Sequence, residues 1–197
     1  MSERPIAVGD PDAPIAAVVL HGREMCGADL APFAAPLAND AYWIFPDAPL
    51  AAGRGRSWWP AGPHGRVEAR AHLDGILATV HQPFVLAGFS QGGMLAMDYV
   101  LHGGRRPAAL ALLSSTRIAI ADWTACARTG ILADLPILVA HGTGDAELAF
   151  TAGEQLRDFA TAHGAAVQWL PFDGGHQLPF VVWRALRKLV GSMRRRA

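Results

Sequence analysis

Residues 84–99 have the sequence FVLAGFSQGGMLAMDY, and this stretch decides the fold. It begins with a short apolar run bounded by Pro83 and Gly88, which predicts a buried strand. It ends with apolar side chains at helical spacings among good helix formers, which predicts a helix. The pattern G-x-S-x-G, with Ser90 at its centre, lies between the two. The stretch therefore predicts a serine on a sharp turn between a strand and a helix.

Such a turn has chemical consequences for its serine. Only residues without a bulky Cβ fit on either side of it, which accounts for the glycines at 88 and 92. The turn lifts the hydroxyl clear of the sheet and places it at a helix N-terminus, where backbone N–H groups and the helix dipole favour negative charge. Ser90 is therefore the candidate nucleophile, and a glycine-rich turn with an incidental serine is the alternative.

Composition limits the class of protein. The chain has 197 residues, of which 51% are hydrophobic and 17% charged, so we expect one compact domain over residues 1–197. The formal net charge of +0 gives no electrostatic case for binding nucleic acid or an anionic membrane. Cys26 and Cys126 lie far apart with no C-x-x-C spacing, so neither a zinc site nor a disulfide framework is predicted.

Targeting signals are also not apparent. The first ten residues lack a basic region followed by an apolar segment, so no signal peptide is predicted. The apolar runs are too short to span a bilayer, so stable membrane insertion is not expected. A cytoplasmic protein is the expectation, and a homodimer is left open.

Strand and helix patterns alternate along the chain. Strands are expected at residues 15–20, 42–45, 84–87, 108–113, 137–140 and 167–170. Helices are expected at residues 30–39 (with Asp29 as N-cap), 67–80, around Trp123, 151–163 and 180–193. This alternation predicts an α/β fold with a mostly parallel central sheet and helices on both faces. Residues 46–65, rich in proline, glycine and tryptophan, are predicted to be irregular, and 48–65 is a candidate lid or substrate wall.

A serine nucleophile needs a base, and the base needs a group that orients it. In hydrolases with a G-x-S-x-G turn, the acid and then the histidine follow the serine along the chain. Asp145 closes the turn after the strand expected at 137–140, and His176 follows the strand expected at 167–170. Because ligand sites in such sheets lie at the carboxyl ends of the strands, we expect both residues beside Ser90. Asp173 is the rival acid, and its closeness to His176 favours a role in shaping the loop.

The oxyanion of an acyl-transfer reaction requires backbone N–H donors. One is expected from Gln91, the residue after the nucleophile, and another from the loop after the first long strand, where Arg23 is the candidate. His21 and His141 both precede a glycine at a strand end, and we expect them to hold those turns rather than to act in catalysis.

Six motifs span nearly the whole chain: LHG at 20–22, FPDAP at 45–49, WW at 58–59, GFSQGG at 88–93, HGTGD at 141–145 and GH at 175–176. Together they resemble the phospholipase/carboxylesterase family of α/β hydrolases, which includes the acyl-protein thioesterases. The resemblance implies an α/β-hydrolase fold and a Ser90–Asp145–His176 triad. It also implies an oxyanion hole formed by the backbone N–H groups of Arg23 and Gln91.

The chain departs from this family at three places. Arg23-Glu24 stand where a small apolar residue and a glycine are usual, and Trp59-Pro60 stand in place of the usual continuation of the tryptophan motif. The usual proline after the acid is replaced by the sequence AELA at 146–149. The chain also begins close to its first long strand, so shortened N-terminal strands are expected.

The predicted function is hydrolysis of a small carboxylic ester or thioester substrate through an acyl-enzyme on Ser90, with no metal or organic cofactor. Apolar side chains near the site in sequence are candidates for the substrate pocket, with ordinary packing as the alternative for each. They are Met25, Trp58, Trp59, Met94, Leu148, Leu178 and Phe180. Two other functions stay open: a non-catalytic binding protein on the same fold, and a lactone- or dienelactone-type hydrolase.

Overall fold

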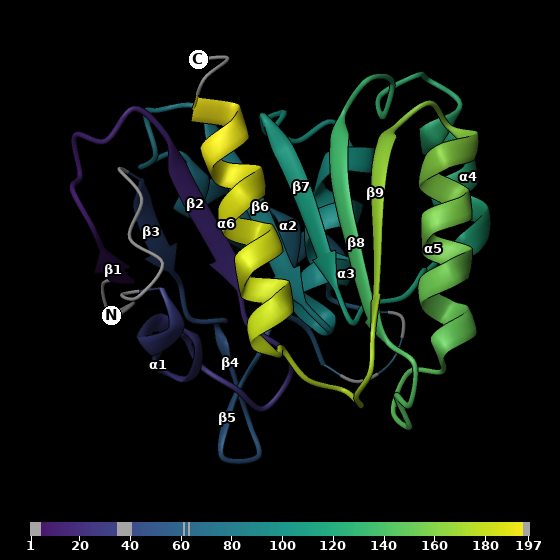
Figure 1. Ribbon diagram of the computed structural model, residues 1–197, viewed down its shortest axis with the longest axis horizontal. Helices are drawn as coiled ribbons and strands as arrows, with labels where there is room; N and C mark the ends of the chain where they lie inside the picture. The colour runs from purple at the N-terminus through teal and green to yellow at the C-terminus, as the bar shows by residue number, and fades with distance from the viewer. Residues whose placement is uncertain (1–4, 35–40, 61, 63, 195–197) are drawn as a thin grey trace.

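A seven-stranded sheet forms the centre of the molecule, with helices on both faces (Figure 1). The computed structural model describes residues 5–34, 41–60, 62 and 64–194. The strand order is β1-β3-β2-β6-β7-β8-β9. The bounds are β1 (Ile6–Val8), β2 (Ala16–Leu20), β3 (Tyr42–Phe45), β6 (Phe84–Phe89), β7 (Ala109–Leu113), β8 (Pro136–Gly142) and β9 (Ala166–Phe172).

The sheet is parallel except at one edge. Strands β3, β2, β6, β7, β8 and β9 pair in parallel, and only the three-residue β1 pairs antiparallel, with β3. The predicted fold class, with its mostly parallel sheet and shortened N-terminal strands, is confirmed. Because the strands are parallel, their carboxyl ends gather at one edge, which is the lower edge in Figure 1.

Each face of the sheet is covered by its own layer of helices. Alternate residues of a strand point to opposite faces, so Ala16 and Val18 join one hydrophobic cluster while Ala17 and Val19 join the other. The first cluster contains side chains from α2 (Arg66–Leu77), α3 (Gln91–Leu101), α4 (Ile120–Ala127) and α5 (Phe150–Ala162). The second contains side chains from α1 (Gly27–Leu30), the 3-10 helix η1 (Ala31–Phe33) and α6 (Phe180–Arg194). Among the described residues, no helix is both long enough and apolar enough to cross a membrane.

The helix predicted at residues 30–39 is wrong in its described part. The α-helix starts at Gly27 and ends at Leu30, and a single 3-10 turn follows it. Asp29 lies inside the helix, where its carboxylate accepts the N–H of Cys26 at 2.8 Å, so it is not the N-cap. Pro32 lacks the N–H that a continuing α-helix requires, which explains the change to a 3-10 turn. Residues 35–40 of this prediction lie outside the described residues.

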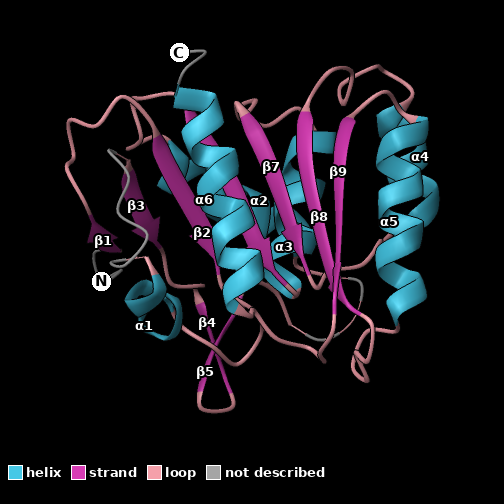
Figure 2. Cartoon of the chain, in the orientation of Figure 1, coloured by secondary structure: helices cyan, strands magenta, loops and turns pink. Residues whose placement is uncertain are grey.

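The prediction that residues 46–65 are irregular is also wrong in part. They contain a two-stranded antiparallel hairpin, β4 (Leu50–Ala52) and β5 (Gly55–Ser57), which lies beyond the carboxyl edge of the main sheet (Figure 2). Gly53 turns the chain with a φ of 53°, a conformation that glycine adopts without strain. The hairpin is placed where it can border a site at that edge.

Candidate active site

Ser90 forms the turn between β6 and α3. Its φ of 51° and ψ of −117° are unusual for a residue with a Cβ, and such a conformation costs on the order of 1–3 kcal/mol. The Ser90 N–H donates to the Leu113 carbonyl at 2.9 Å, which ties the turn to the end of β7. Ser90 is the N-cap of α3, so the N–H of Gln91 begins the helix without an intrahelical acceptor. The strained turn thus places a partly buried serine beside an available N–H.

Two glycines are required because backbones approach closely at this turn. A Cβ on Gly88 would lie 2.2 Å from the Gly92 carbonyl carbon. A Cβ on Gly92 would lie 2.4 Å from the Leu20 carbonyl oxygen, at the end of β2. The outer glycines of G-x-S-x-G therefore allow the start of α3 to pack against β6 and β2.

Asp145 and His176 meet at the same edge of the sheet. His176 Nδ1 donates to Asp145 Oδ2 at 2.8 Å, across 31 positions of sequence. The Asp145 side chain is fully buried, and that of His176 is only 10% exposed. This bond fixes Nδ1 as the protonated nitrogen and leaves Nε2 as an acceptor.

Asp145 is surrounded by donors that keep it ionised. Burial alone would raise the pKa of its carboxyl group. The Leu148 N–H at 2.8 Å, the His176 imidazole and the Glu147 N–H at 3.0 Å outweigh burial, so the pKa of Asp145 is lowered. Asp145 is therefore a carboxylate at neutral pH and can orient His176.

A second imidazole contacts the same carboxylate. His141, fully buried at the end of β8, places Nε2 2.8 Å from the Leu148 carbonyl and 3.3 Å from Asp145 Oδ2. The contact supports the expected structural role of His141, because it holds the turn that carries Asp145. Sequence analysis missed this contact. The signal for it was that His141 and Asp145 stand four positions apart where a strand ends.

His176 lies next to the serine turn. Its ring centroid is 4.9 Å from that of Phe89, the residue before Ser90. Among the described residues, no hydrogen bond joins Ser90 to His176. The three residues thus meet at one edge, with the Asp145–His176 contact formed. In ligand-free active sites, catalytic hydrogen bonds are often long or poorly aligned and tighten when substrate binds.

The loop after β2 is held rigidly. His21 is fully buried; its Nδ1 donates to the Gly22 carbonyl at 2.7 Å, and its Nε2 accepts the Ala48 N–H at 3.0 Å. Burial lowers the pKa of His21 below its usual value, so the ring is neutral at neutral pH. These contacts fix the start of the loop that carries Arg23.

Arg23 and Gln91 contribute side chains of different character. The Arg23 side chain is half exposed and forms an ion pair with Glu24 at 3.8 Å. The Gln91 side chain is buried and bonds to the segment after the hairpin: Oε1 accepts from the Trp58 N–H at 3.0 Å, and Nε2 donates to the Trp59 carbonyl at 3.1 Å. Gln91 therefore links the serine turn to residues 57–59.

The hairpin packs against the loop that carries Arg23. The Glu24 N–H donates to the Arg56 carbonyl at 2.8 Å, and the Arg56 N–H donates to the Met25 carbonyl at 2.9 Å. Arg56 Nη2 also donates to the Pro49 carbonyl at 3.1 Å. The hairpin is thus a wall beside this loop, fixed by backbone hydrogen bonds.

The predicted pocket residues differ in burial. Trp58 and Trp59 are 1% and 7% exposed and belong to the core under the site, and the Trp58 indole donates to the His21 carbonyl at 2.8 Å. Phe180 is 65% exposed at the start of α6. The partly buried residues of the set are Met25, Met94, Leu148 and Leu178.

Glu147 is a charged residue that sequence analysis noted only as a departure from the family. Its carboxylate lies 3.8 Å from His176 Nε2, and its side chain is 73% exposed. It follows Asp145 by two residues, on the same turn. A second carboxylate therefore stands at the outer side of the imidazole.

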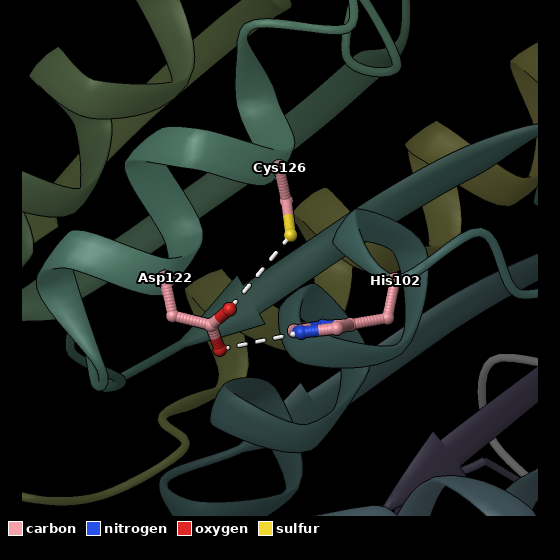
Figure 3. A group of neighbouring side chains, drawn as sticks. All are labelled: His102, Asp122 and Cys126. Atoms are coloured by element: carbon pink, nitrogen blue, oxygen red, sulfur yellow. Dashed lines mark hydrogen bonds and ion pairs between the residues drawn. The ribbon is translucent and has the colours of Figure 1, made fainter.

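Away from this site, one group of described side chains could offer ligand atoms to a metal ion. It consists of His102, Asp122 and Cys126, whose ligand atoms lie within 4.8 Å of one another. Figure 3 shows His102 facing Asp122 and Cys126 of α4. Asp122 Oδ2 is 3.2 Å from His102 Nε2 and 3.4 Å from the Arg66 guanidinium. Because Arg66 already balances this carboxylate, the group is explained as an ion-pair network between helices.

Asp98 is the buried centre of that network. It is 1% exposed and accepts from Arg66 at 2.7 Å, Arg70 at 2.5 Å and the Trp123 indole at 2.6 Å. Its donors lie on α2 and α4, and Asp98 itself lies on α3. The Asp98 network therefore joins three helices of one layer.

Comparisons with known proteins support the fold described above. A family model described as phospholipase/carboxylesterase matches residues 77–190. A crystal structure of esterase PE8 superposes with a TM-score of 0.83 at 22% identity, over 98% of this chain and 100% of that one. Acyl-protein thioesterase 2 of Zea mays gives a TM-score of 0.84 at 18% identity, over 97% and 99% of the two chains. A Bacillus cereus carboxylesterase gives 0.76 at 16% identity, over 96% and 93%. No curated protein matches the sequence.

Proposed function

The chain belongs to the phospholipase/carboxylesterase family of α/β hydrolases and is an esterase-type hydrolase. We propose that it cleaves carboxylic esters or thioesters through an acyl-enzyme on Ser90. The observation that supports this most is the 2.8 Å hydrogen bond between Asp145 and His176, beside a serine held at positive φ. A binding protein would not require a buried, ionised acid aimed at an imidazole next to a strained serine.

Proton transfer follows from the nitrogen assignments. Because Nδ1 of His176 donates to Asp145, Nε2 has a free lone pair and takes the proton of Ser90 as the hydroxyl attacks the acyl carbonyl. The imidazolium that forms is stabilised by Asp145, whose lowered pKa keeps it negative. When substrate binds, rotation of the Ser90 side chain or a small movement of the loop around His176 brings the hydroxyl within hydrogen-bond distance of Nε2.

The oxyanion forms at the start of α3. The N–H of Gln91 and the N–H of Arg23 are the proposed donors, and the dipole of α3 adds to their effect. Losing one such donor typically reduces turnover by about 10²- to 10³-fold. The buried side chain of Gln91 and the hairpin contacts to Glu24 and Met25 support this role, since they limit the movement of both donors.

The remaining steps release the two products. His176 Nε2 returns its proton to the leaving oxygen or sulfur, which leaves the acyl group on Ser90. Water, deprotonated by the same nitrogen, then attacks the acyl-enzyme, and the serine takes back the proton. We propose that the acyl group rests against the partly buried Met25, Met94, Leu148 and Leu178, and that Trp58 and Trp59 support this surface from the core.

Active-site labelling tests the proposal. We expect a fluorophosphonate probe to label the native protein and not Ser90→Ala, with thermal stability of the variant retained. We also expect p-nitrophenyl esters of short acids to be hydrolysed by the native protein, and Ser90→Ala to lose this activity by at least about 10³-fold. A native protein that is neither labelled nor active, with its fold intact, would support the binding-protein alternative instead.

A further inference from the structure

The position of Glu147 is set by the turn that holds Asp145. The backbone N–H groups of Glu147 and Leu148 both donate to Asp145 Oδ1, at 3.0 and 2.8 Å. Since the Asp145 side chain is fully buried, the backbone at residue 147 is fixed relative to the imidazole that Asp145 orients. Only the exposed side chain of Glu147 can move, and its carboxylate lies 3.8 Å from His176 Nε2.

Glu147 differs from Glu24 and Glu154 in its partner. Glu24 pairs with Arg23 at 3.8 Å, and Glu154 pairs with Arg157 at 4.0 Å. Within the described part of the chain, no lysine or arginine lies within 4.0 Å of Glu147, and its contact is with His176, which forms an ion pair only when the ring is protonated. While His176 is neutral, no cation among the described side chains lies within 4.0 Å of the Glu147 carboxylate.

The atom beside Glu147 is the one that, in the proposed reaction, protonates the leaving group. In the proposed reaction, Nε2 of His176 hands its proton to the leaving oxygen or sulfur, so that atom must come within about 2.6–3.2 Å of Nε2. The carboxylate of Glu147, whose side chain is 73% exposed, lies 3.8 Å from the same nitrogen. A positive charge two or three bonds beyond the leaving atom would therefore lie within a few ångströms of Glu147.

Resting on the proposed function, we propose that Glu147 selects esters and thioesters whose leaving group carries an ammonium group close to the scissile bond. Attraction between exposed unit charges about 4 Å apart corresponds to about a five-fold change in an equilibrium or rate ratio. The preference acts on kcat/KM, because the charge stays on the leaving group in both the bound substrate and the transition state.

A pair of esters with the same shape isolates this effect. Choline butyrate and 3,3-dimethylbutyl butyrate differ only in the quaternary nitrogen, which is a carbon in the second, so size and acyl chain cancel in the ratio of their kcat/KM values. We expect the native ratio to favour the choline ester and to shrink as salt is added, since screening weakens exposed charges. Glu147→Gln should lower the ratio by about five-fold, Glu147→Asp should restore part of it, and Glu147→Lys should invert it.

Glu154→Gln is the control, since it removes a partly exposed glutamate of α5 that the proposed site does not include, and it should leave the ratio unchanged. The same pair of esters separates the two proposals. If the native protein hydrolyses neither ester, the proposed function fails. If the native protein hydrolyses them, but Glu147→Gln has the native ratio, the function stands and the role of Glu147 is refuted.

Discussion

Replacing Gly92 by alanine should damage both the fold and the site, because the added methyl has no space. Its Cβ would lie 2.4 Å from the Leu20 carbonyl oxygen and 2.7 Å from that of His21. Both are backbone atoms, of the last residue of β2 and of the residue after it, and Leu20 pairs with β6, so they cannot rotate away as a side chain would. The start of α3 must therefore move away from β2.

The size of this movement sets the expected effect. Carbon–oxygen contacts below 3.0 Å are essentially never seen for a real Cβ, so α3 must shift by at least about 0.6 Å. Overpacking of this kind costs roughly 1–3 kcal/mol of unfolding free energy. The same shift moves Ser90 and the Gln91 N–H relative to the loop after β2, and a misplacement of about 1 Å can cost 10²-fold in rate.

Urea unfolding and p-nitrophenyl ester hydrolysis measure the two effects on one preparation. Gly75→Ala is the control: it makes the same chemical change within α2, where nothing lies within 4 Å of the added Cβ. Since alanine is the better helix former, this control should gain up to about 1 kcal/mol and keep its activity. If folded Gly92→Ala has native stability and native kcat/KM, the argument from close backbone approach is refuted.

Two further predictions concern stability alone. Asp98→Ala leaves two arginines and an indole without their common acceptor, so we expect urea unfolding to show a loss of about 3–5 kcal/mol in the free energy of unfolding. As a control, Asp158→Asn, which changes an exposed ion pair, should leave the urea midpoint unchanged. Burial and the hydrogen bond to Asp74 raise the pKa of Tyr99 to about 12. The folded state therefore holds this proton more tightly than the unfolded state, and stability that is present below pH 10 is lost as the pH rises toward 12. Guanidinium unfolding of Tyr99→Phe should show less of this alkaline loss than native protein, and equal losses would contradict the assignment.

The fold could be predicted because its central strands, β2, β6 and β7, are apolar over their whole length. Strands of a parallel sheet are buried on both faces and therefore form continuous hydrophobic runs, such as residues 15–20. The C-terminal ends of the strands were predicted less accurately. Strands β6, β8 and β9 continue to Phe89, Gly142 and Phe172, each beyond the predicted end. At these positions, glycine and proline suggested a break, although the neighbouring strands still supply hydrogen-bond partners.

The hairpin could not be predicted because its stability does not come from its own sequence. Strands β4 and β5 have three residues each, LAA and GRS, and show no useful alternation of apolar and polar residues. What holds them is tertiary: backbone bonds from Arg56 to the loop after β2, and the Gln91 side chain that bonds to residues 57–59. Both contacts join segments more than 30 positions apart, and no local pattern reports them.

Asp145 and Glu147 show why residue type alone does not assign a role. The two acids stand two positions apart on one turn, yet Asp145 is fully buried with three hydrogen-bond donors while Glu147 is 73% exposed. The turn itself creates this difference, because the N–H groups of residues 147 and 148 fold back onto Asp145 and direct the Glu147 side chain outward. The buried acid can hold only the Nδ1 side of His176, and the exposed acid reaches only the Nε2 side. By our two proposals, one turn thus supplies a group that orients the base and a group that selects what the base releases.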